Sequence, residues 1–297
     1  MSILSKIDYF VEHDLCHSKA GMMLMSVLRR TGISRSIRKM LVYRQMDRGN
    51  YVGIQDVQDS GVFYQENSNR IDQICGWLAD EESRETYMQT IQFRISKKRK
   101  DLPRRYPEEM QYFDKVIRLH SHEVFVDCGA YTGDTAERFI KKTHGKYKKI
   151  VCFEPDAQNY RVLQQKTIAN LIPIQAGVWS EDTVLHFDSD QATGSKITDS
   201  ALQNSVEVAV KSIDNTEACA DATFIKMDIE GAELPALRGA EKTILRNHPK
   251  LAICIYHSNE DMLRIAEYIH SLVPEYKLYV RHYTYEMMET VLYAVMD

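Results

Sequence analysis

Four residues suited to polar chemistry stand at the ends of short apolar runs in this 297-residue chain: Asp127, Glu154, Asp228 and His257. The runs that precede them are rich in residues that favour β-strands. In an open parallel sheet, ligands bind beyond the carboxyl ends of the strands. Polar groups at such an edge must be hydrated or paired, because burying them alone is costly. We therefore expect the four side chains to meet in one ligand-binding cleft.

A glycine-containing loop follows the first of these strands. Residues 123–135 read EVFVDCGAYTGDT, with Gly129 and Gly133 placed between the strand and an amphipathic segment that begins near Thr132. Glycines let the backbone approach a ligand closely or adopt positive φ. The first N–H groups of the following helix have no partner within that helix and can donate to a polar ligand. This order of strand, loop and helix predicts a cofactor site.

The first position of the loop indicates which cofactor binds. A dinucleotide loop reads G-x-G-x-x-G, whereas this loop reads D-x-G-A-x-x-G and has a carboxylate at Asp127. An acid there suits a cofactor with a cationic end, and S-adenosylmethionine carries an ammonium and a sulfonium group. Glu154 follows the next strand, 25 residues beyond Gly129, where it can accept hydrogen bonds from ribose hydroxyls. Alternatively, Glu154 only begins a turn before a helix that Asp156 caps.

Three segments together resemble one family: VFVDCGAYTGDT at 124–135, CFEPD at 152–156 followed by NYRVL, and FIKMDIEGAE at 224–233. The resemblance is to the FkbM-type methyltransferases, a branch of the S-adenosylmethionine-dependent enzymes, and covers about residues 120–296. LADEES at 78–83 and QYF at 111–113 are similar to the segment that precedes this domain in bacterial members. The candidate cofactor-binding residues are Asp127, Gly129, Ala130, Tyr131, Gly133, Thr135, Glu154, Pro155 and Asp228.

The candidate catalytic residues are Asp228, Glu230 and His257. We expect Asp228 and Glu230 to contact the methionine moiety or the acceptor hydroxyl, whereas Glu233 is equally well explained as an acidic residue in the first turn of a helix. His257 is a candidate general base, because its ordinary pKa near 6.5 suits proton acceptance at neutral pH. The same three residues are an alternative site for Mg²⁺ or a similar hard ion. No compact ligand motif supports a metal, and none is assigned.

The expected reaction is methyl transfer to oxygen. Displacement at a sulfonium methyl group depends on holding the acceptor in line and excluding water. The family resemblance implies an oxygen acceptor, so the expected substrate is a small molecule or glycan that offers a hydroxyl. The alternatives are an N-methyltransferase, a macromolecule methyltransferase, and a non-catalytic S-adenosylmethionine-binding or scaffold protein.

Strands and helices alternate from residue 123 onward. The expected strands are 123–127, 149–154, 172–178, 223–228, 251–256, 276–281 and 290–296, and the expected helices are about 132–143, 157–170, 234–247 and 261–272. Such alternation predicts a parallel sheet with helices on both faces. Because no helix separates the last two strands, we expect an α/β, Rossmann-like seven-stranded methyltransferase sheet, mostly parallel, whose last strand is antiparallel. Residues 183–187 and 206–211 predict an antiparallel pair around a flexible loop at 188–205.

Three regions are expected along the chain: an N-terminal helical region of unknown role at 1–60, a helical pre-domain or lid at 61–120, and the methyltransferase domain at 121–297. The polar stretch 49–69 is expected to join the first two. Residues 106–119 predict a helix, in which Tyr112 and Phe113 are candidate lid or adenine-side aromatics.

Composition limits the classes of binding partner and the cellular compartment that we expect for this protein. A net charge of −4 argues against a general nucleic-acid binder. The six cysteines form no C-x-x-C pair, which favours a reducing cytoplasm, and we expect neither a signal peptide nor a transmembrane segment. Residues 1–50 carry nine basic and four acidic side chains, which suits peripheral contact with an anionic membrane or an acidic partner. The preferred interpretation is a helical pair packed on the main domain with its arginines in solvent, and no function is assigned to the segment. The oligomeric state does not follow from the sequence.

Overall fold

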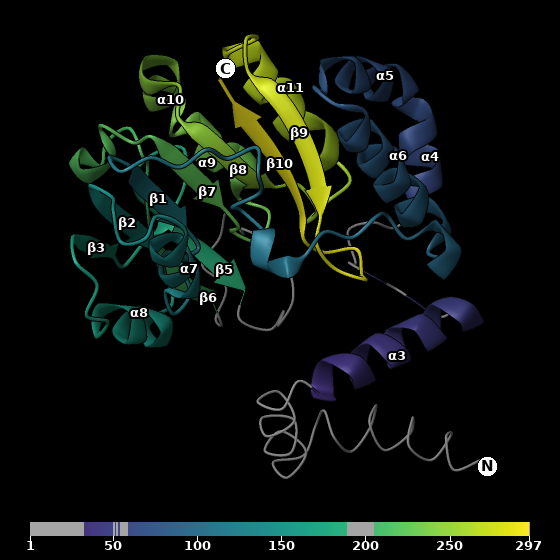
Figure 1. Cartoon of the computed structure of the whole chain (residues 1–297), viewed down its shortest axis with the longest axis horizontal. Coiled ribbons are helices and arrows are strands. Elements are labelled where there is room, and N and C mark those ends of the chain that lie inside the picture. The colour runs from purple at the N-terminus through teal and green to yellow at the C-terminus, as the bar shows by residue number, and fades with distance from the viewer. Residues whose placement is uncertain (1–32, 50, 52, 54–58, 189–204, 297) are drawn as a thin grey trace.

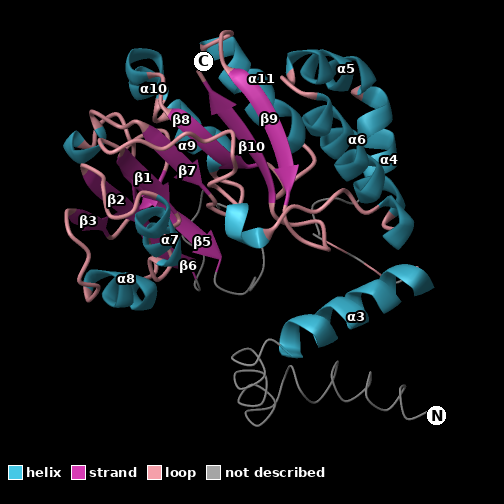
Figure 2. Ribbon diagram, viewed as in Figure 1, coloured by secondary structure: helices cyan, strands magenta, loops and turns pink. Residues whose placement is uncertain are grey.

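The computed structural model describes residues 33–49, 51, 53, 59–188 and 205–296, and its centre is a seven-stranded sheet with helices on both sides (Figures 1 and 2). The strands of this sheet are β1 Val124–Cys128, β2 Lys149–Phe153, β3 Leu171–Ile174, β7 Phe224–Met227, β8 Lys250–Cys254, β9 Lys277–His282 and β10 Thr290–Val295. The α-helices are α3 Ile33–Arg48, α4 Ser60–Glu66, α5 Ser68–Trp77, α6 Glu81–Ser96, α7 Asp134–Lys142, α8 Ala157–Gln164, α9 Glu233–Arg238, α10 Glu241–Asn247 and α11 Asp261–Leu272.

The order of the strands is β3-β2-β1-β7-β8-β10-β9. The neighbouring pairs from β3 to β8 are parallel, and β10 runs antiparallel to both β8 and β9. The predicted α/β sheet of seven strands with an antiparallel last strand is therefore confirmed. A smaller sheet has the order β4-β6-β5, formed by β4 Gly177–Val178, β5 Thr183–Asp188 and β6 Ser205–Lys211. The predicted antiparallel pair around 188–205 is β5 and β6, and 189–204 lie outside the described residues.

Both faces of the large sheet are buried, because successive residues of its central strands alternate between two apolar cores. Val126 of β1 belongs to one core, which includes Ile225 and the apolar sides of α9, α10 and α11. Phe125 belongs to the other, in which it stacks on Phe139 of α7 with ring centroids 4.6 Å apart. Burial on two faces explains why these strands read as continuous apolar runs in the sequence.

The helices α4, α5 and α6 lie beside β9 and α11 (Figure 1) and contribute to the first core. Ile74 of α5 and Tyr87 of α6 are fully buried there. Backbone contacts continue the sheet toward these helices, since Leu78 forms a parallel bridge with Leu278 and Ala79 N–H donates to the Leu278 carbonyl over 2.8 Å. The helices of the segment 61–120, which is predicted to be a helical pre-domain or lid, are thus part of the packing of the sheet.

The predicted helix 234–247 is two helices. It is interrupted at Gly239 and Ala240, between α9 and α10. A Cβ on Gly239 would lie 2.1 Å from the carbonyl oxygen of Trp179, and the Gly239 carbonyl accepts a hydrogen bond from Asp214 N–H over 2.8 Å. Close tertiary contact at this glycine therefore interrupts a segment whose apolar spacing indicates one helix.

The predicted helix 106–119 is wrong. The segment contains a short 3₁₀ helix at Glu108–Met110 and then turns, with Tyr112 at a φ of +65°. The segment begins in extended form, because Arg105 forms a parallel bridge with His282 of the edge strand β9. Pro107 then precedes the 3₁₀ helix. Phe113 packs in the second core against Phe125.

Several predicted boundaries also move. The strand predicted at 172–178 is β3 plus β4 of the smaller sheet, the helix predicted at 157–170 ends at Gln164, and the strand predicted at 251–256 ends at Cys254. The joint predicted at 49–69 contains α4. Residues 1–32 lie outside the described residues, and α3 places Val42 and Met46 in a small core with Phe93. The domain limits at 60 and 120 stay predictions.

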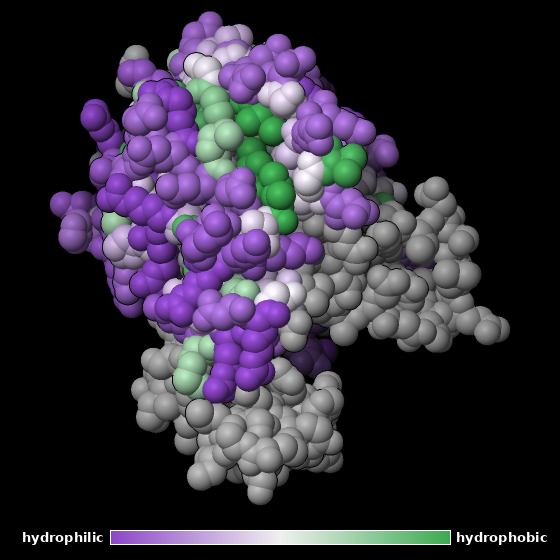
Figure 3. All heavy atoms as spheres, turned by 90° about the vertical axis from the view of Figure 1, so that its right-hand side faces the viewer, coloured by the Kyte–Doolittle hydropathy of each residue, from purple (hydrophilic) through white to green (hydrophobic). Residues whose placement is uncertain are grey.

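Figure 3 shows a face covered mainly by hydrophilic residues, with a narrow apolar band between them. Within the described part of the chain, no helix combines the length and apolarity needed to cross a bilayer. The cysteines at 75, 128, 152, 219 and 254 carry free thiols.

Candidate active site

The carboxyl edge of the sheet brings together residues that are far apart in the sequence. Asp228 directly follows β7, and its backbone N–H donates to the Cys128 carbonyl at the end of β1 over 3.2 Å. His257 lies three residues beyond β8 and contacts Asp228. Glu154 directly follows β2 and contacts the loop after β1. The structure therefore brings Asp228 and His257 together at this edge and joins Glu154 to the loop after β1. That all four side chains line one ligand-binding cleft stays a prediction.

The loop after β1 needs glycine at position 129, because its backbone lies against the residue that follows the neighbouring strand β7. Gly129 has a φ of +77°, and a Cβ there would lie 2.0 Å from the carbonyl oxygen of Asp228. The N–H groups of Gly129 and Ala130 donate to the Phe153 carbonyl over 3.1 and 3.0 Å. Gly133, at a φ of +84°, precedes α7. The loop is therefore fixed between β2 and β7.

Glu154 holds the same loop from the other side. Its Oε2 accepts a hydrogen bond from Tyr131 N–H over 2.7 Å, and its Oε1 accepts one from Asp156 N–H over 2.9 Å. Asp156 in turn caps α8, as expected, by accepting from Gln158 and Asn159 N–H. Burial raises the pKa of Glu154 despite these bonds. Tyr131 itself is exposed and has a φ of +50°.

Asp127 has a cationic partner within the protein. The Lys226 ammonium lies 3.1 Å from Asp127 Oδ1, and both side chains are almost completely buried. The two residues are paired by register on β1 and β7. Burial raises the pKa of Asp127 to about 6, while burial alone would lower that of Lys226 and the nearby carboxylates raise it. At neutral pH the pair is therefore a carboxylate beside an ammonium group.

Two tyrosine hydroxyls donate hydrogen bonds to the Asp228 carboxylate, one to each oxygen. Tyr112 Oη donates to Asp228 Oδ2 over 2.7 Å, and Tyr256 Oη donates to Oδ1 over 3.0 Å. Burial works to raise the pKa of Asp228, but the His257 imidazole and the Lys226 ammonium outweigh it and hold the pKa below its usual range. Tyr112, a predicted lid aromatic, is thus a buried support of this carboxylate.

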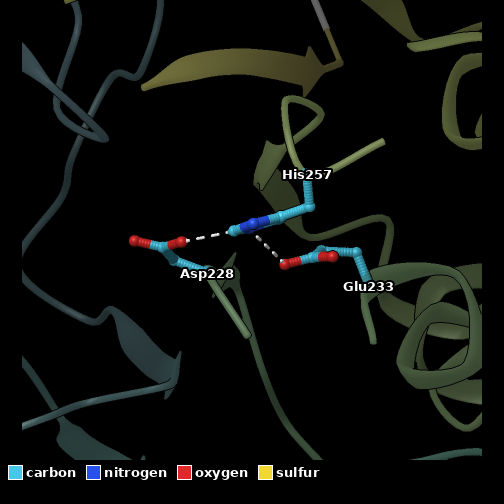
Figure 4. A group of neighbouring side chains, drawn as sticks. All are labelled: Asp228, Glu233 and His257. Carbon is cyan, nitrogen blue, oxygen red and sulfur yellow. Dashed lines mark ion pairs between the residues drawn. The ribbon is translucent and has the colours of Figure 1, made fainter. Parts of the chain in front are cut away.

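The imidazole of His257 lies among three carboxylates. Its Nε2 is 3.4 Å from Asp228 Oδ1 and 3.2 Å from Glu233 Oε1, as Figure 4 shows, and its Nδ1 is 3.6 Å from Glu230 Oε2. Glu233 is fully buried, whereas the Glu230 side chain is largely exposed and its backbone has a φ of +57°.

The ordinary pKa expected for His257 is wrong. Burial lowers the pKa of this imidazole, but the carboxylates of Glu233 and Asp228 outweigh burial and raise it to about 11. In the protein alone the ring therefore carries a proton at pH 7, so it cannot accept another. The geometry does place His257 with Asp228 and Glu230, but it does not support the expected role of a neutral base.

Comparison with known proteins provides the family. A model of the methyltransferase FkbM domain matches residues 127–287, more than half of the chain. The chain belongs to the FkbM methyltransferase family.

A solved structure agrees with this assignment. The methyltransferase FkbM of Methylobacillus flagellatus KT has 28% sequence identity and a TM-score of 0.68, over 80% of this chain and 60% of that chain. An rRNA methylase from Streptococcus thermophilus has 16% identity and a TM-score of 0.38, over 60% of this chain and 90% of that one. Aeropyrum pernix fibrillarin, whose structure contains S-adenosylmethionine, has 13% identity and a TM-score of 0.37, over 60% and 70%. No curated protein matches the chain.

Glu289 is a carboxylate at this edge of the FkbM protein that the sequence did not reveal. It precedes β10, where the pairing of Val291 with Cys254 places it across from Tyr256. Gln111 Nε2 donates to its carboxylate, and its backbone has a φ of +63°. Burial, followed by the charge of Asp228, raises the pKa of Glu289 to about 7. A carboxyl group that exchanges its proton near neutral pH therefore stands at this edge.

Arg94 of α6 was also missed. Its side chain is fully buried, and its guanidinium donates to the carbonyls of Tyr256 and Ser258, the residues on either side of His257. A lone arginine on a helix gives no signal of this contact in the sequence. Its effect is to fix the backbone that carries the imidazole of the FkbM site.

Two further candidate cofactor-binding residues, Thr135 and Pro155, lie near the loop after β1. Thr135 is buried in the first turn of α7, and Pro155 lies exposed between Glu154 and the cap of α8. Cofactor binding by these residues and by the loop stays a prediction.

Proposed function

We propose that this FkbM-family protein transfers a methyl group from S-adenosylmethionine to a hydroxyl group of a small molecule or a glycan. The observation that supports this best is an acidic strand edge next to a tightly held glycine loop. The chain spans about 60% of the length of the FkbM structure that it matches. The choice of oxygen as acceptor follows the family resemblance, since the fold alone accommodates many acceptors.

The residues of the loop fit the nucleoside part of the cofactor. Each carboxylate oxygen of Glu154 accepts one backbone hydrogen bond and has a second lone pair, so the group retains capacity for ribose hydroxyls. Glu154 is 5% exposed, so a ribose would meet only the small part of this side chain that remains open. Its position beyond β2 is the one that dinucleotide-type folds use for ribose.

The charges at the edge fit the cationic part of the cofactor. Because Asp127 is already paired with Lys226, we assign the contact with the cofactor's ammonium end to the carboxylates of Asp228 and Glu230. The protonated His257 offsets only one of the nearby negative charges. When bound, S-adenosylmethionine supplies a methyl group attached to a cationic sulfur.

Glu289 is the group best suited to take the proton of an alcohol acceptor. It lies at the same edge as Asp228, and its pKa of about 7 matches the pH at which a general base works well. Asp228 has a lowered pKa and is a weaker base, so its role is to hold and orient. This assignment replaces His257 as the base.

Cofactor binding tests the proposal first. S-adenosylmethionine and S-adenosylhomocysteine should raise the melting temperature, because a ligand that binds only the native state stabilises it. Glu154→Gln should weaken binding by about 1–3 kcal/mol through loss of charge-assisted hydrogen bonds. Isothermal titration calorimetry measures both effects. Asp221→Asn, at an exposed surface ion pair, is the control and should bind as the wild type does. Equal affinity in Glu154→Gln would remove this residue from the ribose.

Turnover tests the assignment of the base. Glu289→Gln should reduce methyl transfer about 10²–10⁴-fold while leaving cofactor affinity unchanged, because a general base acts only in the chemical step. The measurement is single-turnover transfer from methyl-labelled cofactor to an acceptor found by screening cell extracts. Label on a nitrogen atom or on a macromolecule would contradict the proposed hydroxyl acceptor. Cofactor binding with no labelled product from any extract would indicate a cofactor-binding protein without catalytic activity.

A further inference from the structure

Three side chains at the carboxyl edge direct their polar atoms toward one point. Asp228 follows β7, Glu233 begins α9 and His257 follows β8, so three separate segments supply them. One ligand atom from each lies within 4.8 Å of the others. Figure 4 shows the ring of His257 facing the two carboxylates.

The spacing of these atoms suits ligands of one metal ion. Bonds of about 2.1 Å from a divalent ion to nitrogen and oxygen place neighbouring ligand atoms about 3.0–3.4 Å apart in octahedral or tetrahedral coordination. His257 Nε2 lies 3.4 Å from Asp228 Oδ1 and 3.2 Å from Glu233 Oε1.

Two polar atoms in this cluster are left without hydrogen-bond partners. His257 is 9% exposed, and its Nε2 lies at ion-pair distance from the Asp228 and Glu233 carboxylates but forms no hydrogen bond of regular geometry among the described residues. Glu233 is fully buried, and its Oε2 likewise has none there. Because a buried polar atom without a partner is costly, such atoms indicate a missing ligand.

The charge of the cluster also requires a cation. Asp228, Glu230 and Glu233 surround one imidazole, which supplies at most one positive charge, and the Lys226 ammonium is paired with Asp127. Buried carboxylates are stable when they are paired or bind a metal.

The candidate ligands are fixed by further contacts. Tyr112 and Tyr256 orient Asp228, and Ile229 N–H donates to Glu233 Oε1 over 2.8 Å. Hydrogen bonds of this kind orient the ligands in known metal sites and contribute strongly to metal affinity.

We propose that Asp228, Glu233 and His257 bind one divalent transition-metal ion of the Mn²⁺ or Zn²⁺ class, and that the imidazole releases to solvent the proton that it carries in the metal-free protein. One imidazole with two carboxylates suits these ions better than Mg²⁺, which prefers oxygen ligands alone. Three protein ligands leave coordination positions open for water or an acceptor oxygen. The site goes beyond the proposed function, because its ligands include Glu233 and His257, which the proposed cofactor contacts do not use. It shares Asp228 with those contacts, so metal binding is tested without cofactor.

The test is metal binding by the full chain after treatment with a chelator, without cofactor or acceptor. Calorimetry with MnCl₂ and with ZnCl₂ should show one ion per chain, and electron paramagnetic resonance should show loss of the free Mn²⁺ signal. His257→Gln and Glu233→Gln should each lower the affinity by more than about tenfold, since even supporting residues contribute 10–100-fold. Glu230→Gln is the matched comparison: it removes an exposed charge beside the same imidazole but leaves the three ligands intact, so it should lower the affinity by less than about tenfold.

Circular dichroism of each variant without metal separates loss of a ligand from loss of the fold. The proposal fails if the wild type binds neither ion at about 1 mM, or if folded His257→Gln and Glu233→Gln bind as tightly as Glu230→Gln. Because the measurement uses no S-adenosylmethionine, failure here leaves the proposed methyl transfer standing. Loss of cofactor binding would likewise leave the metal site standing.

Discussion

Replacing Lys226 by methionine should lower the free energy of unfolding by about 3–5 kcal/mol, because it leaves the Asp127 carboxylate buried without a counter-charge. Lys226 is 2% exposed and Asp127 is fully buried, so water cannot substitute for the ammonium. The same ammonium donates to the Gly129 carbonyl over 2.9 Å, so the loop after β1 should loosen as well. Urea denaturation followed by circular dichroism measures the change.

Two further variants show whether burial is the cause. The double variant Asp127→Asn with Lys226→Met should recover much of the loss, since it removes both charges. Lys148→Met disrupts a surface pair with Asp221, in which the lysine is 58% exposed, and should cost at most about 1 kcal/mol. If Lys226→Met proved no more destabilising than Lys148→Met, the buried pair would not be important for stability.

Gly129→Ala should destabilise the fold by about 2–5 kcal/mol. A left-handed conformation costs a residue with a Cβ about 1–2 kcal/mol, and forcing atoms into a packed site adds about 1–3 kcal/mol. Here the added carbon would lie 2.0 Å from the backbone oxygen of Asp228, which no side-chain rotation can relieve. We expect a lower melting temperature and weaker cofactor binding, because relief of the clash requires β1 and β7 to separate at the site.

Gly76→Ala is the matched control. Gly76 lies in α5, and a Cβ there meets nothing within 4 Å. Alanine is the better helix former by up to about 1 kcal/mol, so this variant should be as stable as the wild type or slightly more so. Equal melting temperatures for the two alanine variants would show that the loop after β1 can move freely away from Asp228.

The sequence predicts the parts of the fold that local pattern determines. Continuous apolar strands identify the sheet, and the polar residues that end them identify its functional edge, as for Asp228 and Glu154. The helix at 261–272 matches α11 because its apolar spacing agrees with its tertiary environment. The interruption at Gly239 could not be predicted, because it depends on the carbonyl of Trp179, which is distant in the sequence.

The features of the site that the sequence did not predict depend on strand pairing and on contacts between distant segments. Glu289 reaches the carboxyl edge from the start of an antiparallel strand, so the rule that looks for polar residues after strands does not find it. The pairing of Lys226 with Asp127 depends on register between two strands nearly a hundred residues apart. The charge state of His257 depends on carboxylates from two other elements, which spacing along the chain does not reveal.

The contact of Arg94 with the backbone around His257 links the FkbM segment of this chain to residues outside the family match. The match covers residues 127–287, yet Arg94 comes from α6, and β10, which pairs with β8 inside the sheet, follows the match. A fragment of this chain limited to residues 127–287 would leave the carbonyls of Tyr256 and Ser258 without these donors and would lack a strand from the interior of the sheet. The part of this chain that must stay together for the site to form is therefore larger than the segment that identifies the family, and it includes α6.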